Sequence, residues 1–264
     1  MNVSRKFKVF SDEKYAVMHT YGTDVESDVS FQKGMWDMEK REQNLENAYC
    51  FCEAAGIDAR DNLAVIGFNQ NDNTCRIIDG PDKDVLTKKD GNVLITSGKT
   101  VLMGWAADCC LVGFVVNGGE YVAVAHASVN TLKNGVIDTA MTQIMKLAGI
   151  DCYVEAFVGA CIGKCCYEYG REKAYDDFKD YRHCIYLTDD PEKVTLDLYA
   201  AVVSALIDAG VDEIADIFEE DKRCTACAKD IEGNYMFSSY RREKDPEDPK
   251  KHINGQYGLF IAIK

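Results

Sequence analysis

The sequence predicts a mixed α/β (α+β) fold in which helices flank a central core of mixed β-sheets. Strands and helices alternate without the regular rhythm of a doubly wound parallel sheet, and hairpin-like spacings occur beside longer crossovers. The chain has 264 residues and a hydrophobic fraction of 47 %, enough for an ordinary globular core. No stretch has the composition of an interdomain linker. We therefore expect a single domain over residues 1–264.

Local patterns predict the elements in chain order. Apolar residues at helical spacing predict helices over 42–56 and 135–147, each followed closely by a glycine. A further helix is expected from Pro191 to Ala209, because proline favours the first helical turn and Gly210 follows the last. Residues 243–252 are charged, contain two prolines and predict a surface loop, as do residues 69–74. Apolar runs predict strands over 62–68, 75–78, 101–105, 121–125, 154–158 and 257–263, with strand and turn over 7–19.

The charge of the chain excludes several kinds of partner. The formal net charge is −14 and the isoelectric point is near 4.7. This disfavours nucleic acids, whose non-specific binding depends on lysine and arginine, and it disfavours anionic membrane surfaces. No apolar run approaches the roughly 20 residues of a membrane span, and the N-terminus lacks the apolar stretch of a signal peptide. A cytoplasmic location is expected.

Twelve cysteines are an unusually high number for a chain with no sign of export. In a reducing compartment most of them would be small buried apolar residues. Two groups stand out, Cys161 with Cys165 and Cys166, and the pair Cys224-x-x-Cys227. Four of these thiols can bind a structural zinc ion if the fold brings them together.

The most informative local feature is Asp108-Cys109 followed by His126. A predicted strand precedes each of them, and Val116 to Glu120 is a turn signal of the kind that joins hairpin strands. Two hairpin strands would bring Cys109 and His126 to the same end of one sheet. So placed, a thiol and an imidazole can share a metal or form a nucleophile and base. The alternative is a buried cysteine beside a core histidine.

The order of the motifs resembles the bacterial laccase-domain family, also described as multicopper polyphenol oxidoreductase-like. The most specific block runs from Gly159 to Gly170, because so unusual a string rarely recurs by chance. The other matching blocks are Ala107-Asp108-Cys109, Ala125-His126-Ala127, Asp197-Leu198-Tyr199, Cys224-Thr225 and Phe237-Ser238-Ser239-Tyr240-Arg241-Arg242. The resemblance implies a zinc-dependent purine nucleoside phosphorylase with adenosine deaminase side activity, acting on a purine nucleoside and phosphate. It also implies a fold similar to the catalytic domain of cytotoxic necrotising toxins, which are cysteine deamidases.

The resemblance further implies a set of site residues. The family metal is held by a histidine of a Gln-x-His-Gly loop, the cysteine of Thr-Ala-Asp-Cys and the histidine of His-Ala-Gly-Trp-Arg-Gly. Cys109 and His126 match the second and third ligands, and Asp72 stands in place of the first. An aspartate can bind zinc through oxygen, although Asp72 also suits a turn. Asp108 is expected to orient the site rather than bind the metal.

The remaining candidates concern the substrate. Arg241 and Arg242 are candidates for holding phosphate, and Asn130 stands where the family has an arginine. The loss of that arginine and of the neighbouring tryptophan indicates a divergent member. Two alternatives therefore stay open, a metal-free Cys109/His126 hydrolase or deamidase and a catalytically silent homologue. Copper is not expected, because a type-1 copper site needs two histidines with a cysteine and the chain has four histidines in all.

Overall fold

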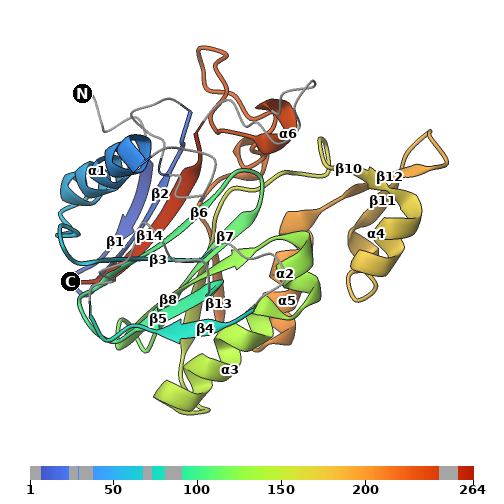
Figure 1. Cartoon of the computed structure of the whole chain (residues 1–264). Coiled ribbons are helices and arrows are strands. Elements are labelled where there is room, and N and C mark those ends of the chain that lie inside the picture. Colours follow the sequence, from blue (N-terminus) through green and yellow to red (C-terminus); the bar gives the residue numbers. More distant parts are fainter. Residues whose placement is uncertain (1–6, 24–28, 30–37, 68–72, 81–90, 244–254) are drawn as a thin grey trace.

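Two large β-sheets pack face to face and form the body of the molecule (Figure 1). The computed structural model describes residues 7–23, 29, 38–67, 73–80, 91–243 and 255–264. The five-stranded sheet has the order β1 (Phe7–Ser11), β2 (Tyr15–Thr20), β14 (Tyr257–Ile263), β6 (Val101–Ala106) and β3 (Leu63–Val65). The six-stranded sheet has the order β13 (Glu213–Asp216), β9 (Val154–Val158), β7 (Cys110–Val116), β8 (Tyr121–Ala127), β5 (Val93–Thr96) and β4 (Cys75–Ile77).

Both sheets are mixed, which confirms the predicted fold class. The pairs β3–β6, β4–β5 and β13–β9 are parallel, and the other described pairs in these two sheets are antiparallel. One apolar core lies between the sheets and joins Leu102 and Met103 of β6 to Leu111 of β7 and Val124 of β8. The strands at this interface are buried on both faces, which explains their continuous apolar runs.

Helices cover the outer faces of the body. The helices α3 (Val136–Ala148) and α5 (Leu198–Asp208) pack on the six-stranded sheet and enclose a second core. The helix α1 (Met38–Ala54) packs by the five-stranded sheet, where the ring of Phe51 meets Phe7 edge to face at 5.9 Å. The short helices α2 (Val129–Lys133) and α6 (Tyr240–Glu243) and the 3₁₀ turns η2 (Arg182–Cys184) and η3 (Glu220–Lys222) lie in the connections.

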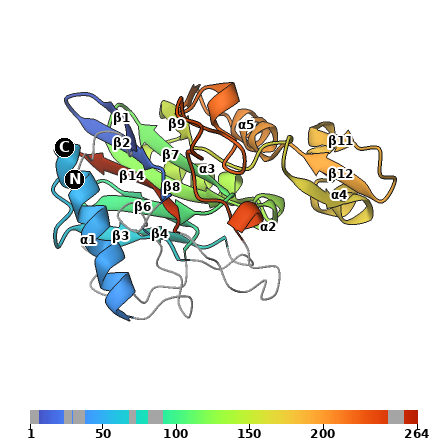
Figure 2. The same cartoon turned by 90° about the horizontal axis from the view of Figure 1, so that it is seen from above.

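A third, three-stranded sheet projects from one side of the body (Figures 1 and 2). It has the order β10 (Glu168–Gly170), β12 (Lys193–Leu196) and β11 (Ile185–Leu187), with α4 (Arg171–Asp177) beside it. We call residues 164–197 the arm.

A buried carboxylate ties the arm to the body. Asp177 of α4 accepts hydrogen bonds from Lys133 of α2 at 2.8 Å and from the hydroxyl of Tyr169 at 2.8 Å, and it also pairs with Lys173. Burial alone would raise the pKa of Asp177, but these three donors outweigh it and lower the pKa to about 2. The ion pair therefore holds α4 against α2 at neutral pH.

The predicted helix from Pro191 to Ala209 is wrong in its first third. Residues 193–196 form β12, with alternating burial, and the helix α5 begins at Leu198. Asp197 caps this helix, because its carboxylate accepts the backbone N–H of Ala200 at 3.0 Å. The alternating residues before this cap, two of them β-branched, favour a strand, so the proline belongs to the turn before β12 rather than to a helix.

Most other predicted elements are confirmed within a few residues, including α3, β9 and β14. The helix expected over 42–56 is α1, which begins at Met38 and ends at Ala54. Two surface loops were predicted, over residues 69–74 and 243–252, and most residues of each lie outside the described part of the chain.

Candidate functional site

The hairpin of β7 and β8 brings Cys109 and His126 to the same end of the six-stranded sheet. The predicted pairing of the strand before the cysteine with the strand before His126 is wrong, because the strand before the cysteine, β6, belongs to the other sheet. The hairpin partner of β8 is β7, which begins directly after the cysteine. The register pairs Leu111 with His126. Leu111 packs in the core between the two sheets, and His126, its partner across the hairpin, faces the same side. Cys109 lies in the bend before β7 and packs against the same core.

The turn of this hairpin has the predicted chemistry. Asn117 and Gly118 have φ values of 49° and 64°, and Gly119 has a φ of 106°. Asparagine and glycine tolerate this left-handed region, which explains why the Asn-Gly-Gly sequence closes the hairpin. The turn fixes the register and therefore fixes the position of His126 relative to Cys109.

Asp108 organises three segments around the site. Its Oδ1 accepts the hydroxyl of Thr225 at 2.7 Å, and its Oδ2 accepts the backbone N–H of Arg241 at 2.6 Å. Its backbone carbonyl accepts the N–H of Ile162 at 2.9 Å. Asp108 is nearly buried and has a φ of 85°, a left-handed conformation that aspartate adopts more readily than most residues. Its carboxylate thus binds two protein groups, and its orienting role stays a prediction.

The five-stranded sheet also contacts the site, through Tyr257 of β14. The Tyr257 hydroxyl donates to the carbonyl of Cys109 at 2.7 Å, and its ring stacks on the imidazole of His19 with centroids 5.1 Å apart. Tyr257 is fully buried. Neither Tyr257 nor Thr225 is among the predicted site residues. A tyrosine in an otherwise apolar strand was the available signal, since a buried hydroxyl needs a partner.

Burial keeps the Cys109 and His126 pair uncharged. Desolvation, followed by the charge of Asp108 and by Cys110, raises the pKa of the Cys109 thiol to about 12. Desolvation lowers the pKa of His126 to about 4. At neutral pH the site therefore holds a thiol and a neutral imidazole rather than a thiolate and an imidazolium.

The helix α2 follows His126 directly and carries Asn130. Ser128 and Thr131, which replace the two glycines of the family motif, form a capping box at the start of this helix. The hydroxyl of Thr131 also donates to the carbonyl of His126 at 2.8 Å. Asn73 donates its side-chain amide to the carbonyls of Thr131, at 3.2 Å, and of Asn134. The predicted ligand Asp72 lies outside the described residues.

The two arginines of the Tyr-Arg-Arg motif have different surroundings. The Arg242 guanidinium donates to the carbonyls of Thr225, Ala226 and Phe237 at 3.0, 2.9 and 2.5 Å and also pairs with Glu243. Four of its five N–H donors are thus committed to protein groups. The Arg241 guanidinium lies over the ring of Tyr167, with its central carbon 5.5 Å from the ring centroid.

Four cysteines gather at the base of the arm. The Sγ atoms of Cys165, Cys166, Cys224 and Cys227 all lie within 4.8 Å of one another, a group that could hold a metal ion. Cys161, from the same sequence cluster, is buried elsewhere in the second core and pairs with Cys224 through a β-bridge. All twelve cysteines carry free thiols in the structure.

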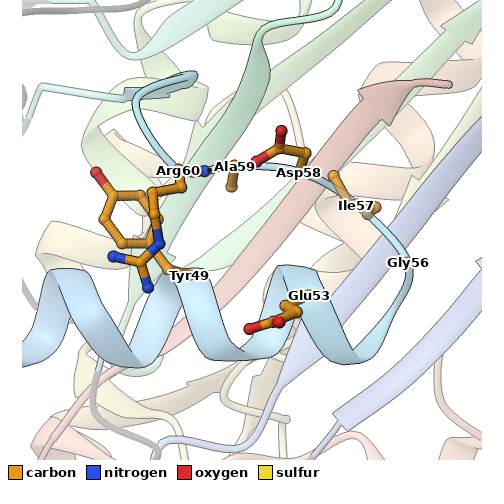
Figure 3. A pocket seen from close by; sticks show the side chains of 7 residues that line it. All are labelled: Tyr49, Glu53, Gly56, Ile57, Asp58, Ala59 and Arg60. Atoms are coloured by element: carbon orange, nitrogen blue, oxygen red, sulfur yellow. Dashed lines mark hydrogen bonds between the residues drawn. The ribbon is translucent and has the colours of Figure 1, made fainter.

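A separate surface pocket of about 400 Å³ lies at the end of α1 (Figure 3). Arg60 stacks over Tyr49 in its wall, with the guanidinium carbon 5.0 Å from the ring centroid, and pairs with Glu46. None of the predicted site residues lines this pocket, so it has no evident relation to the Cys109 site.

The chain matches the family described as multi-copper polyphenol oxidoreductase laccase over residues 20–263. No curated protein matches it. Similar solved structures include the Neisseria meningitidis protein NMB0706, at 19 % identity and a TM-score of 0.73 over 98 % of this chain and 99 % of that one. The Bacillus licheniformis hypothetical protein YfiH is 19 % identical, with a TM-score of 0.75 over 95 % of this chain and 93 % of that one. YlmD from Geobacillus stearothermophilus is 21 % identical, with a TM-score of 0.73 over 95 % of this chain and 92 % of that one. These likenesses confirm the fold.

Across the described part of the chain, no helix is both long and apolar enough to cross a membrane.

Proposed function

The chain belongs to the multi-copper polyphenol oxidoreductase laccase family, and on that premise we propose that it is a divergent zinc-dependent purine nucleoside phosphorylase. The family description associates its members with enzymatic activity. The proposed substrates are adenosine or inosine together with phosphate, with adenosine deamination as a side activity. The observation that carries the proposal is the β7–β8 register, which pairs His126 with Leu111 and so brings His126 to the end of the sheet at which Cys109 precedes β7.

The residues at this end suit zinc, with Cys109 and His126 as ligands and Asp72 as the proposed third. A thiolate and a neutral imidazole are preferred zinc ligands. The lowered pKa of His126 keeps its imidazole neutral, as ligation requires, while Cys109 must lose its proton when the ion binds. Bound zinc would supply Lewis acidity toward an oxygen of the substrate.

The residues around the ligands have separate roles in the proposal. Asp108 orients the loop that carries Cys109, and Tyr257 fixes the same loop from the other sheet. Arg241 is the better candidate for phosphate, because the guanidinium of Arg242 is committed to protein carbonyls and to Glu243. Asn130, in the place of the family arginine, is proposed as a neutral contact to the nucleoside.

The metal-free hydrolase is the less supported alternative. A cysteine nucleophile needs a thiolate, and its pKa of about 12 leaves Cys109 protonated at neutral pH. His126, with a pKa of about 4, is a weak base for removing that proton.

Two measurements test the proposal. The first is release of free purine base from inosine and adenosine with and without phosphate, and the second is zinc content, each for wild type, Cys109→Ser and the control Cys152→Ser. We expect the wild-type protein to release purine base only in the presence of phosphate. Cys109→Ser should abolish this release and should lose about one zinc per chain relative to wild type, whereas Cys152→Ser should keep both the activity and the zinc. Phosphate-independent, metal-independent hydrolysis blocked by a thiol reagent would favour the hydrolase instead. Absence of turnover with every nucleoside would favour the silent homologue.

The single domain over 1–264 and the cytoplasmic location stay predictions.

A further inference from the structure

The four clustered thiols come from two segments that are distant in the sequence. Cys165 and Cys166 lie in the turn just before β10, at the root of the arm. Cys224 and Cys227 lie on the turn after η3, in the body. The cluster therefore spans the junction at which the arm leaves the body. In Figure 1 the chain enters the arm at β10.

The spacing of the sulfur atoms matches a tetrathiolate metal site. Four sulfurs at about 2.3 Å from one zinc ion lie about 3.8 Å from each other in a tetrahedron. The four Sγ atoms here are mutually within 4.8 Å, and those of Cys165 and Cys227 are 3.4 Å apart. This separation is well beyond the roughly 2.05 Å of a disulfide bond.

We propose that Cys165, Cys166, Cys224 and Cys227 bind one structural zinc ion that fastens the root of the arm to the body. The donor set is four cysteine sulfurs, which is typical of closed structural zinc sites. This site is distinct from the Cys109 site and does not depend on the proposed function.

The backbone around the cluster supports a thiolate site. The N–H of Gly163 donates to the Sγ of Cys224 at 3.3 Å, and such a bond stabilises a sulfur that carries negative charge. A side chain at Gly163 would place its Cβ 3.3 Å from the Cβ of Cys224 and 3.4 Å from the Sγ of Cys165. The glycine therefore leaves the room that the converging sulfurs occupy.

The turns that carry the ligands are themselves closed by backbone hydrogen bonds. The N–H groups of Cys166 and Tyr167 both donate to the carbonyl of Gly163 at 2.9 Å, and the N–H of Ala228 donates to the carbonyl of Cys224 at 2.9 Å. The cysteines are thus held in converging positions by the local chain, as a metal site requires.

The ion would also stabilise the surroundings of the Cys109 site. Thr225, between the two body ligands, donates its hydroxyl to Asp108. Tyr167, which follows Cys166, lies beneath the guanidinium of Arg241. One ion between these segments would fix Thr225 beside Asp108 and Tyr167 beside Arg241, so both residues are positioned through the cluster.

The test uses full-length Cys109→Ser protein, because this substitution removes the other candidate metal site. Protein purified without added metal under reducing conditions is measured for zinc content and for zinc X-ray absorption. We expect about one zinc per chain with four sulfur neighbours at about 2.3 Å. A further Cys227→Ser or Cys165→Ser substitution, each at an exposed residue, should reduce the zinc to background, whereas Cys152→Ser should not.

A second readout follows the arm itself. In the Cys109→Ser background, the zinc-free Cys227→Ser protein should show faster amide hydrogen exchange in residues 164–170 and 223–228 than the Cys152→Ser control. Circular dichroism confirms that both proteins are folded.

Four results would overturn the proposal. The first is that Cys109→Ser protein binds no zinc when the ion is supplied, and the second is that its zinc has nitrogen or oxygen neighbours. The third is that Cys227→Ser leaves the zinc content unchanged, and the fourth is that a Cys165–Cys227 disulfide forms in protein prepared under reducing conditions. Since Cys109 is absent throughout, none of these results bears on the proposed phosphorylase.

Discussion

Replacing Asp108 tests whether this residue organises the site, because one carboxylate there holds two segments that the sequence keeps far apart. Oδ1 accepts from Thr225 and Oδ2 from the backbone N–H of Arg241, at 2.7 and 2.6 Å. Asp108→Ala removes both acceptors and also places an alanine at a φ of 85°. Asp108→Asn keeps the shape and the tolerance for this backbone conformation and changes only the charge and one acceptor.

The two variants should therefore differ in stability. Each hydrogen bond to a charged group contributes about 1.5–3 kcal/mol, and a left-handed alanine costs about 1 kcal/mol. Asp108→Ala should then lower the free energy of unfolding by about 4 kcal/mol or more. In Asp108→Asn the new amide can donate to the Thr225 hydroxyl and its oxygen can still accept from Arg241, so only the charge is lost, at about 2 kcal/mol.

Urea denaturation followed by circular dichroism measures these differences. Asp61→Ala is the matched control, since Asp61 is exposed and has a φ of 58°, so it reports only the backbone cost of about 1 kcal/mol. If Asp108→Ala costs no more than Asp61→Ala, the carboxylate does not organise the site. If Asp108→Asn costs as much as Asp108→Ala, the charge matters and the two hydrogen bonds are not re-formed.

Three further predictions concern the scaffold. Because the pKa of Asp177 is lowered to about 2, its ion pair stabilises the fold fully above pH 4 and loses this contribution as the pH falls toward 2. Asp177→Asn should lower the free energy of unfolding by about 1–2 kcal/mol in urea denaturation at pH 7, a figure already reduced because the lysine partners are exposed. At pH 2 the loss should be much smaller, because about half of the Asp177 carboxylates are then protonated in the folded protein. Tyr257→Phe leaves the partly buried carbonyl of Cys109 without its hydroxyl donor and should lower the free energy of unfolding by about 1–3 kcal/mol. An unchanged denaturation midpoint would contradict the contact. Gly159→Ala would bring a Cβ within 2.8 Å of the buried His19 imidazole of β2 and should lower the free energy of unfolding, measured by thermal unfolding, by about 1–3 kcal/mol. The control Gly170→Ala adds its Cβ in open space and should change this free energy little.

The sequence predicted the central part of the candidate site because that part depends on local signals. The Asn-Gly-Gly turn between β7 and β8 sets the register of His126, and Cys109 lies at the same end because β7 begins directly after it. The strand that pairs with β8 follows the cysteine, however, and was not predicted. The predicted fold class is likewise confirmed, since hairpin spacings beside longer crossovers require mixed sheets.

Long-range contacts could not be predicted in the same way. The sequence showed Cys224-x-x-Cys227 but not which thiols it meets, and the structure selects Cys165 and Cys166 over Cys161. The hydrogen bond from Tyr257 to Cys109 joins residues 148 positions apart in two different sheets. The helix predicted from Pro191 failed for a local reason, because Asp197 is the stronger start signal and the residues before it favour a strand.

The departures from the family motif after His126 change the chemistry of the site more than its scaffold. Ser128 and Thr131 replace glycines, yet they cap α2 and bond the carbonyl of His126, so the end of β8 is firmly fixed. Asn130 replaces an arginine and removes a cation from the same turn. The guanidinium of Arg242 is bound to protein groups, so Arg241 is the proposed phosphate contact. The net charge of −14 further disfavours the binding of an anion. A site of this kind retains the proposed ligands but has one cation fewer for an anion, so we expect it to bind phosphate more weakly than family members that keep the arginine.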